Sequence, residues 1–205
     1  MQLPFHGVRA PSTPGEREED RWFGPRSGML FPSPHIARTS EGFGQAIADL
    51  RQLTVALRAD GATGIAVAGV SLGGYVAALW AGLDTLDAVV AVTPAVDLSD
   101  IMAAHGGNEP AWRRAAAAGI DRDLLADAFA AHAPLAHAPR VAPAGRHVIA
   151  GRGDAVIPGD QPTRLADHWG TEVRWFAGGH TAQIGMATVL RRTIDDAAAA
   201  LGLAP

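Results

Sequence analysis

The sequence predicts an α/β fold in which helices flank a mostly parallel central sheet. Strand-like and helix-like segments alternate along the chain, which is the pattern of a parallel sheet with crossover helices. The segment Ala88–Val92 is apolar at every position, as is typical of a strand that is buried on both faces. With 205 residues, of which 48% are hydrophobic, residues 1–205 are expected to form a single domain.

The predicted elements follow one another in a regular order. A short opening strand precedes a loop over residues 7–39, which we interpret as a solvated loop, with a flap over the active site as the alternative. Apolar residues at helical spacing predict a helix over Glu41–Ala59. The later elements are a strand at Gly64–Ala68, a helix at Tyr75–Gly82, strands at Ala88–Val92, His147–Ala150 and Glu172–Phe176, and a helix that starts near Thr181.

Residues 94–145 interrupt this alternation with an alanine-rich, helical stretch. We interpret it as a small helical cap, because insertions at the carboxyl ends of parallel strands cover the pocket where ligands bind. Trp112 and Phe129 are candidate substrate-binding residues, and Leu135 and Met102 are further candidates for the pocket wall. Packing of the cap on the sheet explains the same residues equally well.

The motif Gly69-Val70-Ser71-Leu72-Gly73-Gly74 lies between a predicted strand and a predicted helix. In such a strand–turn–helix context a G-x-S-x-G motif forms a sharp turn that exposes the serine hydroxyl, and the flanking glycines let the strand and helix pass closely. Ser71 is therefore a candidate nucleophile. The alternative is an ordinary tight turn in a chain with 24 glycines.

A serine nucleophile needs a histidine that accepts its proton and a carboxylate that orients the histidine. Asp154 lies just past the predicted strand at His147–Ala150, and His180 follows the strand at Glu172–Phe176. Asp97 is a rival acid, with a helix N-cap as its other interpretation. The other histidines lack a strand-end context, and their spacing does not match a zinc site, so we expect neither a metal nor a cofactor.

These three motifs, in the order Ser71, Asp154, His180, resemble the α/β-hydrolase superfamily. The opening segment around His6 and Gly7 is similar to that superfamily's His-Gly segment after its third strand. The resemblance implies that the backbone N–H groups of Leu72 and Val8 form the oxyanion hole, and that His6 and Gly7 contact the substrate. A surface turn is the alternative interpretation of His6-Gly7.

The chain departs from the superfamily pattern at its N-terminus, because two or more strands usually precede the His-Gly segment, which here begins at residue 6. Either the sheet is trimmed at one edge or the true start lies upstream. A trimmed sheet exposes an unpaired strand edge, which invites formation of a homodimer.

Composition excludes several classes of function. The chain has no cysteine, so disulfides and thiol catalysis are excluded. The net charge of −4 favours binding neither to nucleic acid nor to an anionic membrane. The sequence has no apolar run of membrane-spanning length and no signal-peptide pattern near its start, which predicts a cytoplasmic protein.

The function predicted from these features is hydrolysis of carboxylic esters of small molecules through an acyl-enzyme on Ser71. Dehalogenases and epoxide hydrolases of this superfamily have an aspartate at the nucleophile position, so those reactions are disfavoured. Acyl transfer to another acceptor, or cleavage of a thioester or amide, would use the same three residues. A non-catalytic interaction domain is the third alternative.

Overall fold

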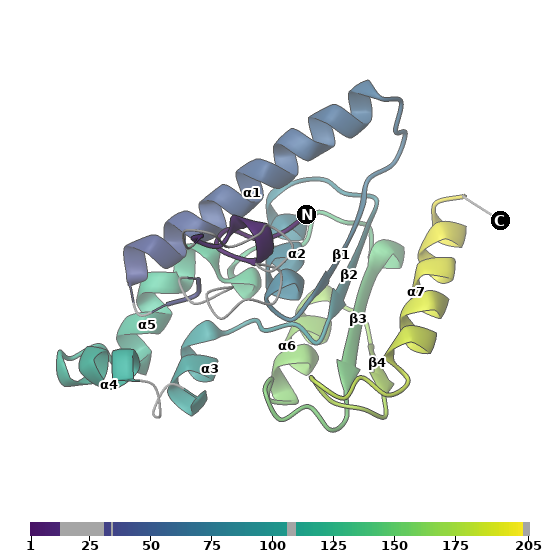
Figure 1. Cartoon of the computed structure of the whole chain (residues 1–205). Coiled ribbons are helices and arrows are strands. Elements are labelled where there is room, and N and C mark those ends of the chain that lie inside the picture. Colours follow the sequence, from purple (N-terminus) through teal and green to yellow (C-terminus); the bar gives the residue numbers. More distant parts are fainter. Residues whose placement is uncertain (13–30, 34, 106–109, 203–205) are drawn as a thin grey trace.

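The computed structural model describes residues 1–12, 31–33, 35–105 and 110–202. Within them lies a four-stranded sheet in the order β1-β2-β3-β4, in which every neighbouring pair is parallel (Figure 1). The strands are β1 (Ala66–Val70), β2 (Ala88–Val92), β3 (Arg146–Gly151) and β4 (Val173–Phe176). The helices are α1 (Ile36–Ala59), α2 (Leu72–Leu83), α3 (Leu98–His105), α4 (Pro110–Ala117), α5 (Arg122–Phe129), α6 (Asp160–Trp169) and α7 (Met186–Ala200), with short 3-10 turns between some of them.

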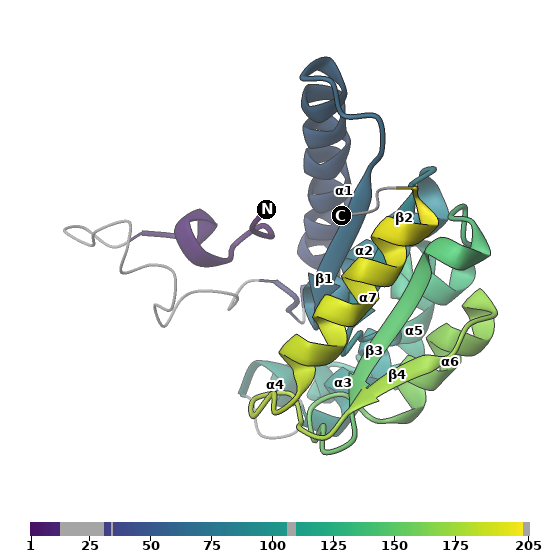
Figure 2. The same cartoon turned by 90° about the vertical axis from the view of Figure 1, so that its right-hand side faces the viewer.

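Helices cover both faces of the sheet (Figures 1 and 2). Every residue of β2 is buried, as the apolar run predicted. Its side chains alternate between the faces, because successive strand residues point to opposite sides. Val89 and Ala91 pack in the large core with α1, α2 and α6, whereas Val90 and Val92 pack with residues of α7. The predicted α/β fold with a parallel, helix-flanked sheet is therefore confirmed.

Most predicted elements are found with small shifts of their ends. Helix α1 begins five residues earlier than predicted, at Ile36, because the His35 ring accepts a hydrogen bond from the Arg38 N–H and caps the helix. Helix α7 begins at Met186 rather than near Thr181. The intervening residues instead form a turn, in which the Gly178 N–H donates to the Ile184 carbonyl.

The predicted opening strand is wrong. Residues 4–6 form a turn and Gly7–Arg9 form a 3-10 helix (η1), which begins after Phe5 takes a positive φ of 59°. A strand requires extended φ values throughout, so this segment does not continue a sheet. Of the predicted loop over residues 7–39, residues 13–30 and 34 lie outside the described part.

In its described residues, the segment between β2 and β3 contains α3, α4 and α5 and three 3-10 turns. These helices lie toward the carboxyl ends of the strands (Figure 1). Helix α5 packs against α3 and against α1. In the described residues, no helix is long and apolar enough to cross a bilayer.

A buried hydrogen-bonded pair lies in the core between α2 and the 3-10 turn η4 (Ala130–His132). The Tyr75 hydroxyl and His132 Nδ1 are 2.9 Å apart, and the His132 ring stacks at 4.4 Å from Phe43. His132 Nε2 is buried and has no hydrogen-bond partner in the described structure. Burial lowers the pKa of His132 to about 4 and raises the pKa of Tyr75, because both charged forms lose their hydration. Both side chains are therefore neutral at pH 7.

The lowered pKa of His132 makes the stability of the protein depend on pH. The unfolded chain binds a proton near pH 6.5, but the folded chain does so only near pH 4, so the stabilisation present above pH 6.5 is lost as the pH falls. We expect the free energy of unfolding to be about 2 kcal/mol lower at pH 5 than at pH 7 from this residue. Urea titrations at the two pH values measure the difference. His132→Gln should reduce it, and an unchanged difference in that variant would contradict the assignment to His132.

Candidate functional site

Ser71 lies on a sharp turn between the last residue of β1 and the first residue of α2. Its backbone has φ 54° and ψ −117°, a conformation that residues other than glycine rarely adopt. The turn is fixed on both sides, because the Ser71 N–H donates to the Val92 carbonyl at 2.9 Å and the Ser71 carbonyl accepts from the Tyr75 N–H at 3.0 Å. This strand–turn–helix geometry is the one predicted for the motif.

Close packing requires glycine at only one of the two positions that flank Ser71 in the motif. A Cβ atom on Gly69 would collide with the Gly73 carbonyl, so the strand and the helix approach too closely for any side chain there. A Cβ on Gly73 would meet nothing within 4 Å. The expectation that both glycines are needed for close passage is therefore correct for Gly69 and wrong for Gly73. Gly74 is the second tight position, because its Cβ would lie 3.1 Å from the Val92 carbonyl oxygen.

This difference predicts opposite effects of alanine at the two positions. Gly69→Ala should lower the free energy of unfolding by about 3 kcal/mol or more, because backbone must shift to accept the methyl group. Gly73→Ala should leave stability unchanged or raise it by up to about 1 kcal/mol, since alanine is the better helix former. Thermal unfolding of the two variants gives the comparison. Equal losses would contradict the steric argument.

Asp154 and His180 come together at the carboxyl ends of β3 and β4. His180 Nδ1 and Asp154 Oδ2 are 2.9 Å apart. The other carboxylate oxygen of Asp154 accepts hydrogen bonds from the Val156 and Ile157 N–H groups, at 2.9 and 2.8 Å. The Asp154 side chain is only 5% exposed, whereas that of His180 is 20% exposed. The carboxylate is thus held in place by its own loop and orients an imidazole that solvent reaches.

Ser71, Asp154 and His180 follow three strands of one parallel sheet, so all three lie at the same sheet edge. In the described structure, no hydrogen bond joins the Ser71 hydroxyl to His180. Contacts between a nucleophile and its base are often longer without substrate and shorten when substrate binds, so this arrangement is compatible with Ser71 as nucleophile and His180 as base.

Asp97 makes a different set of contacts from Asp154. Its Oδ1 accepts from the Ser99 hydroxyl and the Asp100 N–H at the start of α3, as an N-cap does, and its Oδ2 lies 3.4 Å from Arg164. Burial raises the pKa of Asp97, but the hydrogen bonds from Ser99, Asp100 and Arg164 outweigh it, and the pKa lies below its ordinary value. The fully buried Gln161, which the sequence interpretation missed, holds this loop by accepting from the Asp97 N–H. Of the two candidate acids, only Asp154 contacts His180.

The N-terminal segment lies beside the Ser71 turn. His6, Leu72 and Ser71 line one groove, and the His6 Nδ1 is 2.9 Å from the Pro4 carbonyl oxygen. Gly7 has a positive φ of 53° and begins η1. The Val8 N–H, expected in the oxyanion hole, donates to the side-chain Oε1 of Gln2 at 3.1 Å. The sequence contained no signal for this contact of Gln2.

Of the two aromatic residues expected in the pocket, Phe129 lies in the core, and the side chain of Trp112 is not among those that the structure describes. Phe129 is 3% exposed and its ring lies 5.1 Å from that of His132, in the core rather than in the groove with Ser71. Met102 is also part of that core, and Leu135 packs against it. Trp112 belongs to α4, but its side chain lies outside the described part. In the described residues, no three metal-ligating side chains form a cluster.

Comparison with known sequences gives relatives without an assigned activity. No family model matches the chain. Two uncharacterized proteins of Mycobacterium tuberculosis are each 31% identical to it over 186 residues. The match covers 87% of this chain and 40% of the relative, so the chain spans about 40% of the length of the curated relatives it matches.

Comparison with solved structures identifies similar folds at low sequence identity. An acetyl xylan esterase from Paenibacillus matches 78% of this chain and 54% of its own, with a TM-score of 0.60 and 17% identity. A puromycin hydrolase matches 82% of this chain and 26% of its own, with a TM-score of 0.54 and 19% identity. A monoacylglycerol lipase from Paleococcus ferrophilus matches 76% of this chain and 75% of its own, with a TM-score of 0.51 and 17% identity.

Proposed function

This chain has the α/β-hydrolase fold, and we propose that it is a serine hydrolase that cleaves carboxylic esters of small molecules through an acyl-enzyme. The observation that carries the proposal is the 2.9 Å contact between His180 and the buried Asp154, at the same sheet edge as the strained turn of Ser71. A carboxylate that holds the Nδ1 side of an imidazole leaves Nε2 for proton transfer.

In the proposed reaction, the Ser71 hydroxyl attacks the ester carbonyl while His180 Nε2 accepts its proton. The resulting imidazolium is stabilised by Asp154, which stays ionised, and then donates the proton to the leaving alcohol. Water, activated by the same imidazole, attacks the acyl-enzyme and releases the acid. Each half of the reaction passes through one tetrahedral intermediate with a negatively charged oxygen.

The oxyanion donors in this proposal are the backbone N–H groups of Leu72 and Val8. Leu72 follows the nucleophile at the N-terminus of α2, where backbone N–H groups favour negative charge. The Val8 N–H already donates to a side-chain carbonyl oxygen, that of Gln2, so Gln2 must move for Val8 to serve. His6, whose ring lines the same groove as Ser71, and Gly7 would contact the substrate. We also propose that residues 94–145 form a cap over the pocket at the carboxyl ends of the strands.

Labelling with a fluorophosphonate probe tests the proposal. A competent nucleophile forms a phosphonyl ester with the probe, and mass spectrometry should find the adduct on the peptide that contains Ser71. Ser71→Ala should abolish labelling, whereas Ser40→Ala, at a serine of α1, should retain it. Absence of labelling in the unaltered protein, or labelling that persists in Ser71→Ala, would overturn the assignment. Acceptance of the acyl group by added alcohols would then identify a transferase.

A further inference from the structure

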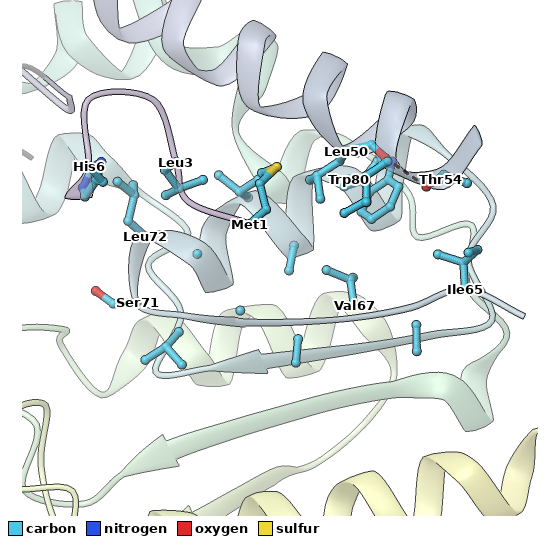
Figure 3. A pocket seen from close by; sticks show the side chains of 18 of the residues that line it. Met1, Leu3, His6, Leu50, Thr54, Ile65, Val67, Ser71, Leu72 and Trp80 are labelled. Atoms are coloured by element: carbon cyan, nitrogen blue, oxygen red, sulfur yellow. Dashed lines mark hydrogen bonds between the residues drawn. The ribbon is translucent and has the colours of Figure 1, made fainter. Parts of the chain in front are cut away.

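Thr93 forms a strained corner where β2 ends. Its backbone has a positive φ of 43°, and of the described residues other than glycine only Phe5 and Ser71 share this property. Such a value is an outlier for a β-branched side chain. The strands β1 and β2 are in register up to Val70 and Val92. Thr93 is therefore the neighbour of Ser71, which occupies the turn that leaves β1 (Figure 3).

The side chain of Thr93 does not explain this conformation. It is buried, and in the described structure its hydroxyl has no hydrogen-bond partner. A threonine that stabilises a turn by itself uses its hydroxyl to bond nearby backbone, which this one does not do. Pro94 follows, and a residue before proline prefers an extended backbone. The local sequence therefore opposes the corner, and contacts with other segments impose it.

Hydrogen bonds fix the chain immediately before the corner. The peptide group between Val92 and Thr93 is bonded on both sides. Its carbonyl accepts from the Ser71 N–H at 2.9 Å, and its N–H donates to the Ile149 carbonyl at 2.6 Å. Because a peptide group is planar, this one unit fixes the backbone of Ser71 relative to β3, the strand that precedes Asp154.

Gln161, in the first turn of α6, fixes the chain after the corner. Its Oε1 accepts from the Val96 N–H at 2.8 Å and from the Asp97 N–H at 3.1 Å, and its Nε2 donates to the Asp97 carbonyl at 3.1 Å. The side chain is fully buried, so all three bonds are shielded from water and are stronger than they would be at the surface. One buried amide thus holds the exit of the chain from β2.

The corner clears space that the proposed reaction needs. Neighbouring strands lie about 4.8 Å apart, so the ends of β1 and β3 are about 10 Å apart, with the end of β2 between them. The imidazole of His180, which contacts Asp154, must therefore pass above the end of β2 to reach Ser71. Two more extended residues of β2 would rise about 7 Å into this space. The turn at Thr93 instead takes the chain to one face of the sheet, where Val96 packs in the large core.

We propose that Gln161 is a positioning residue of this site, because its hydrogen bonds maintain the strained corner at Thr93 and keep the end of β2 out of the path of the imidazole. Without these bonds, Thr93 returns to an extended conformation, and the chain after β2 enters the space between Ser71 and His180. Gln161 touches neither the substrate nor the reacting atoms, and it acts only through the backbone at the exit of β2. This inference rests on the proposed reaction at Ser71.

Gln161→Met tests the proposal, because it keeps the length of the side chain and removes its hydrogen bonds. We expect kcat for a short nitrophenyl ester to fall at least about tenfold while KM changes less than about threefold, since a displacement of about 1 Å near the reacting groups costs up to about 10²-fold in rate. If this variant does not fold, Gln161→Asn shortens the amide by one carbon and makes a smaller version of the change. Thr193→Val is the matched control, because it removes the hydrogen bonds of another fully buried side chain, on α7. It should lower the melting temperature without lowering kcat.

A second substitution separates positioning from a general loss of structure. Glycine adopts a positive φ at little cost, so Thr93→Gly removes the need for Gln161 to hold the corner. When Gln161→Met is combined with Thr93→Gly, kcat should therefore return to within about threefold of that of Thr93→Gly alone, whereas independent effects would multiply. Undiminished kcat in Gln161→Met, or an equal fall with and without Thr93→Gly, would refute the proposal.

The labelling of Ser71 distinguishes this failure from failure of the proposed reaction. If the unaltered protein reacts with the fluorophosphonate probe at Ser71 and Gln161→Met keeps its kcat, only the role of Gln161 is wrong. If the unaltered protein does not react with the probe, the proposed reaction is wrong, and the inference about Gln161 falls with it.

Discussion

Ser71→Ala is expected to lower the turnover of a short nitrophenyl ester by at least about 10⁴-fold. Removal of the hydroxyl leaves His180 and Asp154 with no nucleophile to activate, so acyl-enzyme formation is lost. Binding of the ester should change much less, because the groove and the backbone N–H of Leu72 remain. Steady-state kinetics of the purified variant, compared with the uncatalysed rate, gives the effect.

The fold provides a control for this experiment. Alanine at position 71 must adopt the same φ of 54° as serine does, so the backbone strain of the turn is unchanged and the melting temperature should be too. Ser71→Gly would relieve the strain and should raise the melting temperature while it also abolishes turnover. Undiminished turnover in either variant, with contaminating esterase excluded, would mean that Ser71 is not the nucleophile.

Asp154→Asn is expected to lower turnover by about 10⁴-fold with little loss of stability. The asparagine carbonyl still accepts from the Val156 and Ile157 N–H groups and keeps the loop in place. Its amide NH₂, however, faces His180 Nδ1 and donates to it, which forces the proton onto Nε2. The imidazole then has no lone pair toward the nucleophile.

Asp97→Asn is the matched comparison, because it makes the same change in the rival acid. Asp97 caps α3 and pairs with Arg164, so its loss should reduce the free energy of unfolding by about 1 kcal/mol and change turnover by less than a few-fold. Kinetics and thermal unfolding of both variants, measured in parallel, separate the two roles. Lost turnover in Asp97→Asn with normal turnover in Asp154→Asn would reverse the assignment of the acid.

The sequence predicted the parts of this fold that depend on local pattern. The apolar run of β2 lies buried on both faces, and the strands before Ser71, Asp154 and His180 lie within two residues of the predicted ranges. Residues that follow neighbouring parallel strands share one sheet edge whatever the details of packing. For that reason the meeting of Asp154 and His180 could be anticipated from the order of motifs alone.

Features that depend on contacts between distant segments were decided by the tertiary structure. Gly69 is required because the Gly73 carbonyl lies against it, while Gly73 itself has space, and no local pattern distinguishes the two. The Val8 N–H is occupied by Gln2, which a motif comparison does not show.

The same holds for burial. Phe129 and Leu57 both fit an apolar stripe, yet Phe129 is 3% exposed and Leu57 is 41% exposed. The sequence by itself therefore determined the order of the elements. It also placed the candidate catalytic residues at the carboxyl ends of the strands, because hydrophobic pattern and strand direction are local properties. Tertiary packing alone decided which apolar faces are covered, because burial depends on what lies opposite each face. Among the described residues, no strand pairs with the outer side of β1.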